Sequence, residues 1–412
     1  MRREQFQLLG PLITMSRTKR LAIAAGVLVL GAAAALLQMR THSPPSVTDL
    51  GRDLQQIVSE TVASDSSVKN CTLAVIKGDG SFEWSGAAGT ARRSGQVPMA
   101  PDTPIYIASV TKLYTAVAVM LLYERGALSL DDPMAKYLPE KLIRGIHVYE
   151  GKDYSNTVTI RQLLAHRSGI ADYYEERAAD GKNLFEKFVA EPDRIWTVDD
   201  TIARARDQLK AHFPPGTKTS YSDTNFQLLG KVIEAVAGKP LDDVFEEFFV
   251  RPLKVEHTWL IGRGGEQLHG AVFPADVFAG DLNITKSRSN GAYWADGGIV
   301  STPGEMIRFL RALSEGRIVR PDSLQLMHDW HPWEFPLQYG YGTMYFKLPG
   351  PLSAATGLRD VWGHSGSTGS FLYRSEELDL YMAGTIDQTE SKVKPFVLMR
   401  RVMHAIESRQ RG

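Results

Sequence analysis

The sequence has little of what several classes of protein depend on. Its 412 residues include a single cysteine, Cys71, so the chain cannot form an internal disulfide. It has no basic excess, because 47 Lys and Arg residues balance 47 Asp and Glu residues, and we therefore expect no nucleic-acid partner. No two of the ten histidines have the H-x-x-x-H spacing of a helical metal site. The motif G-x-S-x-G is also missing, which disfavours an α/β-hydrolase.

An uncharged run from residue 21 to residue 37 follows the basic residues Arg17, Lys19 and Arg20. Seventeen residues are at the short limit for a membrane span and long for the apolar part of a cleaved signal, so both interpretations stay open. Either segment places the downstream chain outside the cytoplasm, in the periplasm or another extracytoplasmic space. We expect residues 1–45 to be an export signal or membrane anchor with a linker.

The remaining chain predicts one mixed domain, from 46 to 410. Apolar residues make up 43% and charged residues 23%, as in a soluble globular protein. Strands at both ends of the domain enclose a long region of helices and polar loops, which favours an α/β (α+β) fold with an inserted helical part. We expect the α/β part at about 46–127 and 281–410, and the helical part at about 128–280. The expected helices are 47–62, 109–124 and 394–406, and the expected strands are 72–76, 81–87, 339–346, 369–374 and 378–386.

Ser109 and Lys112 form an S-x-x-K motif at the start of a long apolar helix. Positions i and i+3 share one helical face, so the hydroxyl and the amine can meet, and serine needs such a base to become a nucleophile. The motif is weak by itself, because it also occurs at Ser16/Lys19, Ser66/Lys69 and Ser391/Lys394. Only Ser109 follows an extended stretch and opens an apolar helix, so we expect it to be the nucleophile.

Tyr221 is the second candidate, in the sequence Tyr221-Ser222-Asp223. A tyrosine hydroxyl near a lysine loses its proton more easily and can act as a base. The similar Tyr154-Ser155-Asn156 lies in a charged loop and is interpreted as a surface turn.

The third candidate is the stretch from His364 through Ser365 and Gly366 to Ser367, which precedes a late strand. Its glycine lets the backbone approach a bound ligand closely. The ordinary pKa of histidine, about 6.5, predicts that any charge on His364 fades near neutral pH. His166 is assigned to holding a loop.

These three motifs, in this order, resemble those of the penicillin-recognising serine hydrolases, and most closely the class C β-lactamase and D-alanyl-D-alanine carboxypeptidase group. The stretches 163–170, 297–302 and 339–342 add to the resemblance. It implies an antiparallel sheet flanked by helices, with no metal and no cofactor. It also implies acylation of Ser109, proton transfer by Lys112 and Tyr221, and an oxyanion held by the backbone N–H groups of Ser109 and Ser367.

Two positions depart from the resemblance. His364 stands where many members have lysine, which is more typical of carboxypeptidases and some aminopeptidases or esterases than of β-lactamases. Asp223 stands where the family usually has asparagine, and an ionised carboxylate cannot donate a hydrogen bond to a substrate carbonyl. We expect Asp223, His364, Ser365, Gly366 and Ser367 to contact the substrate.

The expected function is hydrolysis of a peptide or amide through an acyl-enzyme, for example a D-alanyl peptide of the cell wall. An esterase or β-lactamase with the same machinery is the first alternative, because one set of catalytic groups serves several chemistries. A scaffold that binds cell-wall peptides without hydrolysing them is the second. The sequence leaves the oligomeric state open.

Overall fold

The computed structural model describes residues 50–94, 96–262 and 273–410. The expected export signal or anchor, residues 1–45, lies outside these ranges. Within them, no helix is both long and apolar enough to cross a bilayer.

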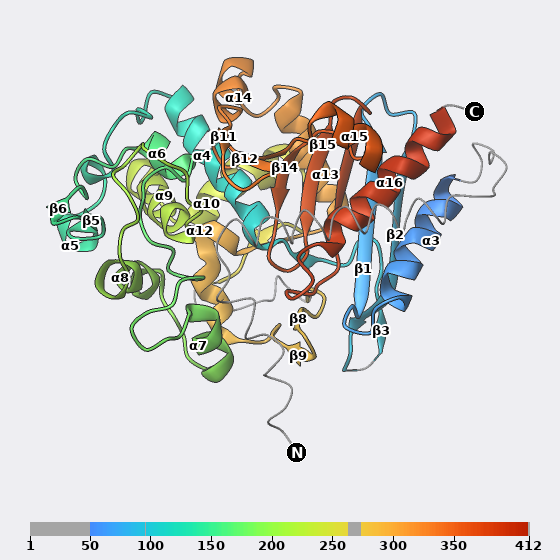
Figure 1. Ribbon diagram of the computed structural model, residues 1–412, viewed down its shortest axis with the longest axis horizontal. Helices are drawn as coiled ribbons and strands as arrows, with labels where there is room; N and C mark the ends of the chain where they lie inside the picture. The colour runs from blue at the N-terminus through green and yellow to red at the C-terminus, as the bar shows by residue number, and fades with distance from the viewer. Residues whose placement is uncertain (1–49, 95, 263–272, 411–412) are drawn as a thin grey trace.

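A nine-stranded sheet joins the two ends of the chain, in the order β11-β12-β13-β14-β15-β16-β1-β2-β3 (Figure 1). Every neighbouring pair in it is antiparallel. The fold class expected from the sequence, an antiparallel sheet flanked by helices, is therefore confirmed. The strands are β1 (Asn70–Lys77), β2 (Glu83–Arg92), β3 (Val97–Pro98), β11 (His331–Pro332), β12 (Leu337–Tyr339), β13 (Met344–Phe346), β14 (Val361–Ser365), β15 (Phe371–Ser375) and β16 (Leu380–Thr385).

The position of each strand explains its sequence. The interior strand β1 is buried on both faces over most of its length, so it is a run of mostly apolar and small residues without alternation. Strand β2, near the edge, alternates between more and less exposed positions. The strand expected at 339–346 is wrong in detail, because Gly340 to Thr343 turn the chain and separate β12 from β13.

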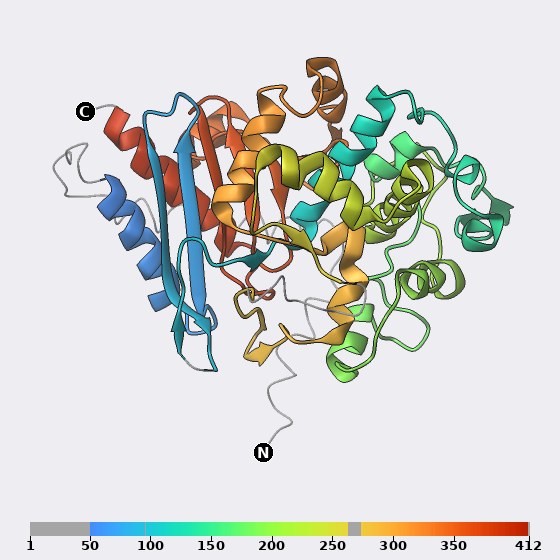
Figure 2. The ribbon, with the colours of Figure 1, turned by 180° about the vertical axis from the view of Figure 1, so that it is seen from behind.

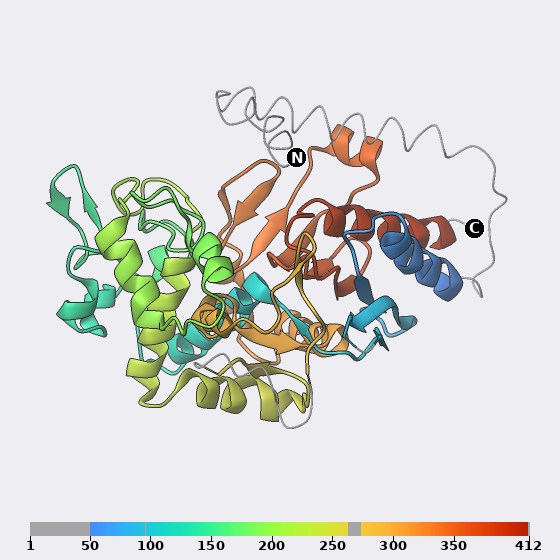
Figure 3. The ribbon, with the colours of Figure 1, turned by 90° about the horizontal axis from the view of Figure 1, so that it is seen from below.

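Helices cover both faces of the sheet. Helices α3 (Leu50–Ala63) and α16 (Lys394–Gln410) lie side by side on one face (Figures 1 and 3). Their apolar positions, such as Leu54 and Val402, are fully buried in one core with the sheet. Helix α13 (Pro303–Ser314) packs on the opposite face, which Figure 2 shows from behind.

Most of the other helices gather beside the sheet, on the side of α13, whereas α15 (Gly350–Thr356) lies near α16 on the opposite face (Figures 1 and 3). They surround α4 (Thr111–Glu124), which packs against α9 (Asp223–Ala237) and α12 (Trp294–Gly297). Almost every residue of α4 is buried, as expected of a helix that is apolar all round. The remaining helices are α5 (Glu140–Ile143), α6 (Ile160–Leu164), α7 (Leu184–Ala190), α8 (Val198–Gln208), α10 (Leu241–Phe245), α11 (Arg251–Leu253) and α14 (Pro321–Met327).

The middle of the chain also contributes short strands. Except for Ile105–Tyr106, which falls in the extended stretch expected before Ser109, the sequence did not predict them. Strands β4 (Ile105–Tyr106), β10 (Ile299–Ser301) and β7 (Trp259–Leu260) form a small sheet just before Ser109. The hairpins β5–β6 (Val148–Tyr149, Lys152–Asp153) and β8–β9 (Phe278–Ala279, Leu282–Asn283) lie at the periphery. Strands of two residues carry no recognisable alternation, which is why the pattern missed them.

Candidate active site

Ser109 lies in a tight turn between β4 and α4. A short 3-10 helix, Ala108–Val110, connects the two elements, and Ala108 has a positive φ of 45°. Two side chains from the loop between β14 and β15 hold the preceding backbone: Thr368 donates to the Tyr106 carbonyl at 2.8 Å and Ser370 to the Ile107 carbonyl at 2.7 Å. The nucleophile expected from the sequence is thus fixed between the sheet and the helices.

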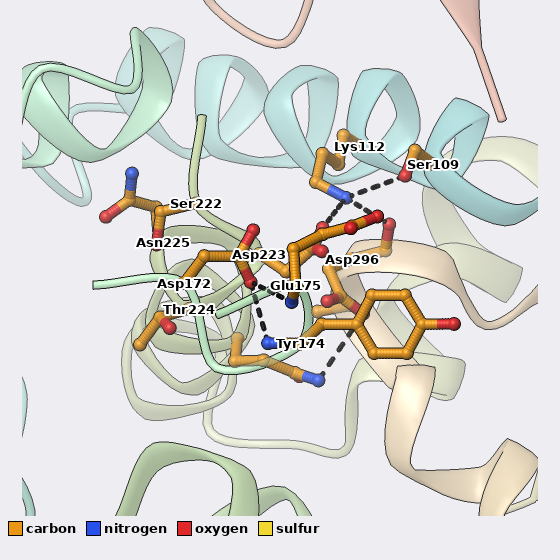
Figure 4. A network of polar contacts seen from close by, with 12 residues as sticks. Ser109, Lys112, Asp172, Tyr174, Glu175, Ser222, Asp223, Thr224, Asn225 and Asp296 are labelled. Atoms are coloured by element: carbon orange, nitrogen blue, oxygen red, sulfur yellow. Dashed lines mark hydrogen bonds and ion pairs between the residues drawn. The ribbon is translucent and has the colours of Figure 1, made fainter. Parts of the chain in front are cut away.

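Lys112, in the first turn of α4, is fully buried. Its Nζ lies 3.1 Å from Ser109 Oγ, 2.7 Å from the carbonyl oxygen of Asp296 and 2.5 Å from Asp223 Oδ1 (Figure 4). Burial lowers the pKa of Lys112, but the negative charges nearby, that of Asp223 first, outweigh it, so the pKa is raised above the ordinary lysine value. In the resting site Lys112 is an ammonium group.

Tyr221 meets Ser109 from the other side. It lines the same depression as Ser109, and Lys112 Nζ lies 5.1 Å from its ring centre. The ring is held between Trp333, at a centroid distance of 5.2 Å, and His166, at 4.2 Å. Burial, together with the charge of Asp223, raises the pKa of Tyr221 well above 10, so the resting tyrosine is a phenol.

His166 holds the loop that carries Tyr221, as the sequence predicted. Its Nδ1 accepts from the Ser222 backbone N–H and from the Asn225 amide, both at 3.1 Å. Burial, and then the charge of Lys112, lowers its pKa well below the ordinary value, so the ring is neutral and serves as an acceptor.

His364 does not titrate near neutrality, and that expectation is wrong. The ring is fully buried, and burial together with the Lys112 charge lowers its pKa to about 3. Its Nδ1 lies 2.7 Å from the Ser365 carbonyl and must donate to it, so Nε2 accepts from the Tyr339 hydroxyl at 2.9 Å. His364 is therefore neutral, and it lies beneath the surface of the cleft.

The residues after His364 do reach the cleft. Ser365, Gly366 and Ser367 line one depression together with Ser109, Tyr221 and Asp223. Gly366 has no side chain for a structural reason, because a Cβ there would lie 2.5 Å from the Ile107 carbonyl oxygen. The Ser367 N–H donates to no acceptor in the described ranges, which leaves it available beside Ser109.

The described residues of the decoy motifs, which are the other S-x-x-K matches and the sequence Tyr154-Ser155-Asn156, lie away from Ser109. Lys69 contacts the carbonyl oxygen of its own Ser66 and pairs with Asp281, and Lys394 pairs with Asp65. Tyr154 lies in the turn after the β5–β6 hairpin, where its backbone N–H bonds to His147. Ser16 and Lys19 fall outside the described residues.

Three functional neighbours were missed by sequence reasoning: Asp172, Asp296 and Tyr339. Asp172 follows the supporting stretch 163–170 of the family resemblance, Asp296 directly precedes 297–302, and Tyr339 belongs to 339–342. Asp296 accepts from the Tyr173 hydroxyl at 2.8 Å, and burial with the Asp223 charge raises its pKa well above 3.8. The only sequence signal for these three residues was their position in or next to a stretch that resembles the family.

The comparisons with known proteins agree with this geometry. The β-lactamase family model matches residues 54–401. The chain belongs to the β-lactamase family. It is 26% identical over 279 residues to the D-alanyl-D-alanine-carboxypeptidase/endopeptidase AmpH of Escherichia coli K12, which covers 68% of this chain and 66% of that protein. It is 32% identical over 178 residues to protein flp of Staphylococcus aureus MW2, which covers 43% of this chain and 32% of that protein.

The chain thus matches less than two thirds of the length of each of these curated relatives. Among solved structures, it resembles the D-amino acid amidase of Ochrobactrum anthropi SV3 in complex with L-phenylalanine amide. The TM-score is 0.72 at 25% identity, covering 88% of this chain and 100% of the amidase.

Proposed function

We propose that the protein is a serine hydrolase that cleaves amide or peptide bonds through an acyl-enzyme on Ser109. The observation that carries the proposal is the contact of the Ser109 hydroxyl with a fully buried lysine, at 3.1 Å, in a cleft that also holds Tyr221. Family membership and the likeness to an amidase support it.

The protonation states define what the reaction requires. Lys112 is an ammonium group and Tyr221 a phenol in the resting site, so a proton must leave Lys112 before Ser109 can be activated. The neutral amine then takes the Ser109 proton as Oγ bonds to the substrate carbonyl carbon. The Tyr221 hydroxyl lies in the same cleft as Ser109 and can donate to the leaving nitrogen. Backbone N–H groups of Ser109 and Ser367 hold the oxyanion.

Water completes the cycle by the same route in reverse. Lys112 first passes the proton that it took from Ser109 to the Tyr221 phenolate, which regenerates the amine and the phenol. Water then attacks the ester carbonyl of the acyl-enzyme, the Lys112 amine takes one water proton, and Lys112 gives a proton to Ser109 Oγ as the ester bond breaks. No step consumes a co-reactant other than water.

The test is covalent labelling of Ser109. A fluorophosphonate and a p-nitrophenyl ester are each mixed with the protein, and the adduct is measured by intact mass. We expect one adduct on the wild type and none on Ser109→Ala, with unchanged circular dichroism. Ser66→Ala and Ser391→Ala are matched controls from the decoy motifs and should label normally. An unlabelled wild type would favour the non-hydrolysing scaffold instead, and labelling of Ser109→Ala would refute the choice of nucleophile.

The cellular location of the protein and the boundaries of its hydrolase domain are also proposals. We propose that residues 21–37 export the chain, as a cleaved signal or as a membrane anchor, and that the hydrolase domain occupies 46–410. The uncharged run after a basic flank supports the first, and the family match over 54–401 supports the second. Fractionation of cells that express the full chain, followed by N-terminal sequencing, distinguishes a cleaved signal from an anchor, and a protein found only in the cytoplasm would contradict both.

A further inference from the structure

Two buried carboxylates face the cleft without a full set of hydrogen-bond donors. Asp172 is 4% exposed and Asp223 is 7% exposed, and both line the depression that contains Ser109. In the described ranges, Asp172 accepts only through Oδ1, from the backbone N–H groups of Tyr174 at 2.7 Å and Glu175 at 3.4 Å. Among the residues that the structure describes, the Asp223 carboxylate contacts only Lys112, through Oδ1. One oxygen of each carboxylate therefore has no protein donor.

The two carboxylates are held next to each other by their flanking residues. The Tyr173 N–H donates to Thr224 Oγ1 at 3.0 Å, and the hydroxyls of Ser222 and Thr224 both donate to the Ala171 carbonyl, at 3.1 and 2.7 Å. The loop of Asp172 is thus fastened to the segment of Asp223 through the residues that flank each carboxylate. Burial, and then the charge of Asp223, raises the pKa of Asp172 well above its ordinary value.

Other charged groups of the cleft already have partners. Glu176 binds His212 at 2.7 Å, and Glu175 lies 4.0 Å from Lys392. The remaining lining carboxylate, Glu334, adds more negative charge. His364 is neutral, so it offers no positive charge to a substrate carboxylate. The cleft next to Ser109 is therefore suited to a cation that can donate several hydrogen bonds.

We propose that Asp172 and Asp223 together bind the protonated primary amino group of the substrate, so that the enzyme acts on amides and peptides with a free amino group close to the scissile carbonyl. This inference rests on the hydrolase proposed above and names its substrate class. An ammonium group supplies three donors, which is enough for the unpaired oxygen of each carboxylate. Asp223 stands where the family usually has asparagine, whose amide can donate to the substrate. With Asp223 the polarity is reversed, because the protein accepts the hydrogen bond and the substrate donates it.

Binding of such a cation also favours the deprotonation of Lys112 that the reaction requires. Lys112 owes its raised pKa chiefly to Asp223 among its charged neighbours. A second cation on Asp223 competes for that carboxylate and lowers the pKa of Lys112. The substrate thereby helps to produce the neutral amine that activates Ser109.

The experiment compares three p-nitroanilides that differ only at the amino position: alanyl, N-acetylalanyl and propionyl, with both enantiomers of the first two. We expect kcat/KM for the better alanyl enantiomer to exceed that of the other two compounds by roughly 10- to 100-fold, the effect of a charged hydrogen bond. In Asp172→Asn this preference should shrink to within a few-fold. The exposed Asp199→Asn is the matched control and should keep the wild-type preference.

The outcomes separate the two proposals. Labelling of wild-type Ser109 by a fluorophosphonate, which carries no amino group, tests the hydrolase alone. If labelling succeeds and N-acetylalanyl or propionyl p-nitroanilide reacts as well as alanyl p-nitroanilide, the ammonium site is refuted while the hydrolase stands. The wild-type comparison needs no variant, so it holds even if Asp172→Asn does not fold. An unchanged preference in a folded Asp172→Asn would also refute the role of Asp172.

Discussion

The two sides of the cleft both bury polar groups next to Ser109, but they do so in different ways. On the Lys112 side, an ammonium group contacts a carboxylate at 2.5 Å, with Asp296 close by. On the His364 side, a neutral chain of hydrogen bonds runs from Tyr339 through His364 to the Ser365 carbonyl. Lys112 and His364 are equally buried, but only Lys112 contacts an opposite charge and is charged itself, because desolvation alone favours the neutral form of a group. The Lys112 side can therefore change its protonation state during the reaction, whereas the His364 side fixes the position of the strand edge.

The largest expected effect within this comparison is that of Tyr221, which adjoins both sides. Tyr221→Phe keeps the ring that packs between Trp333 and His166 and removes only the hydroxyl. We expect kcat for an amide substrate to fall by roughly 10²- to 10⁴-fold, the usual contribution of a positioned acid or base. Tyr154→Phe, from the decoy motif, should change kcat little. Equal effects of the two substitutions would show that the Tyr221 hydroxyl takes no part.

The next test addresses the charge on the Lys112 side. Because the pKa of Lys112 is raised, its neutral form increases only as the pH rises, and the acylation rate should increase with pH above neutrality. Asp223→Asn removes the carboxylate that contributes most to the raised pKa, so the rise should move to lower pH. The measurement is the rate of acylation by a p-nitrophenyl ester, which lacks an amino group, from pH 6 to 10. A profile that does not move would mean that Asp223 does not control the protonation of Lys112.

The smallest effect is expected on the His364 side. His364 has a pKa of about 3, so it does not change charge between pH 5 and 9. His364→Gln retains one donor and one acceptor, for Ser365 and Tyr339, without a titratable group. We expect the acylation profiles of this variant and the wild type to have the same shape, although the absolute rate can differ. An inflection near neutrality that is present in the wild type and lost in His364→Gln would restore a charged role for the histidine.

Much of the site could be predicted from the sequence, because its parts are local. The i to i+3 spacing of Ser109 and Lys112 places both on one face of a helix whatever surrounds it. The apolar character of residues 113–122 agrees with a buried helix, and full burial is what distinguishes Lys112 from Lys69 and Lys394, whose side chains are only partly buried. Tyr221 and the stretch 364–367 were added by their order along the chain, which reflects the family rather than a physical rule.

The protonation states and the contacts between distant segments were decided only by the tertiary structure. Composition and spacing say nothing about whether a histidine is buried beside a lysine, so His364 was expected to titrate near its ordinary pKa and does not. Asp172, Asp223 and Asp296 are far apart in the sequence, and only the fold brings their charges close enough to shift one another's pKa values. The sequence by itself determined which groups can react. The fold determined which of them are charged, because charge depends on burial and on neighbours that the order of residues does not show.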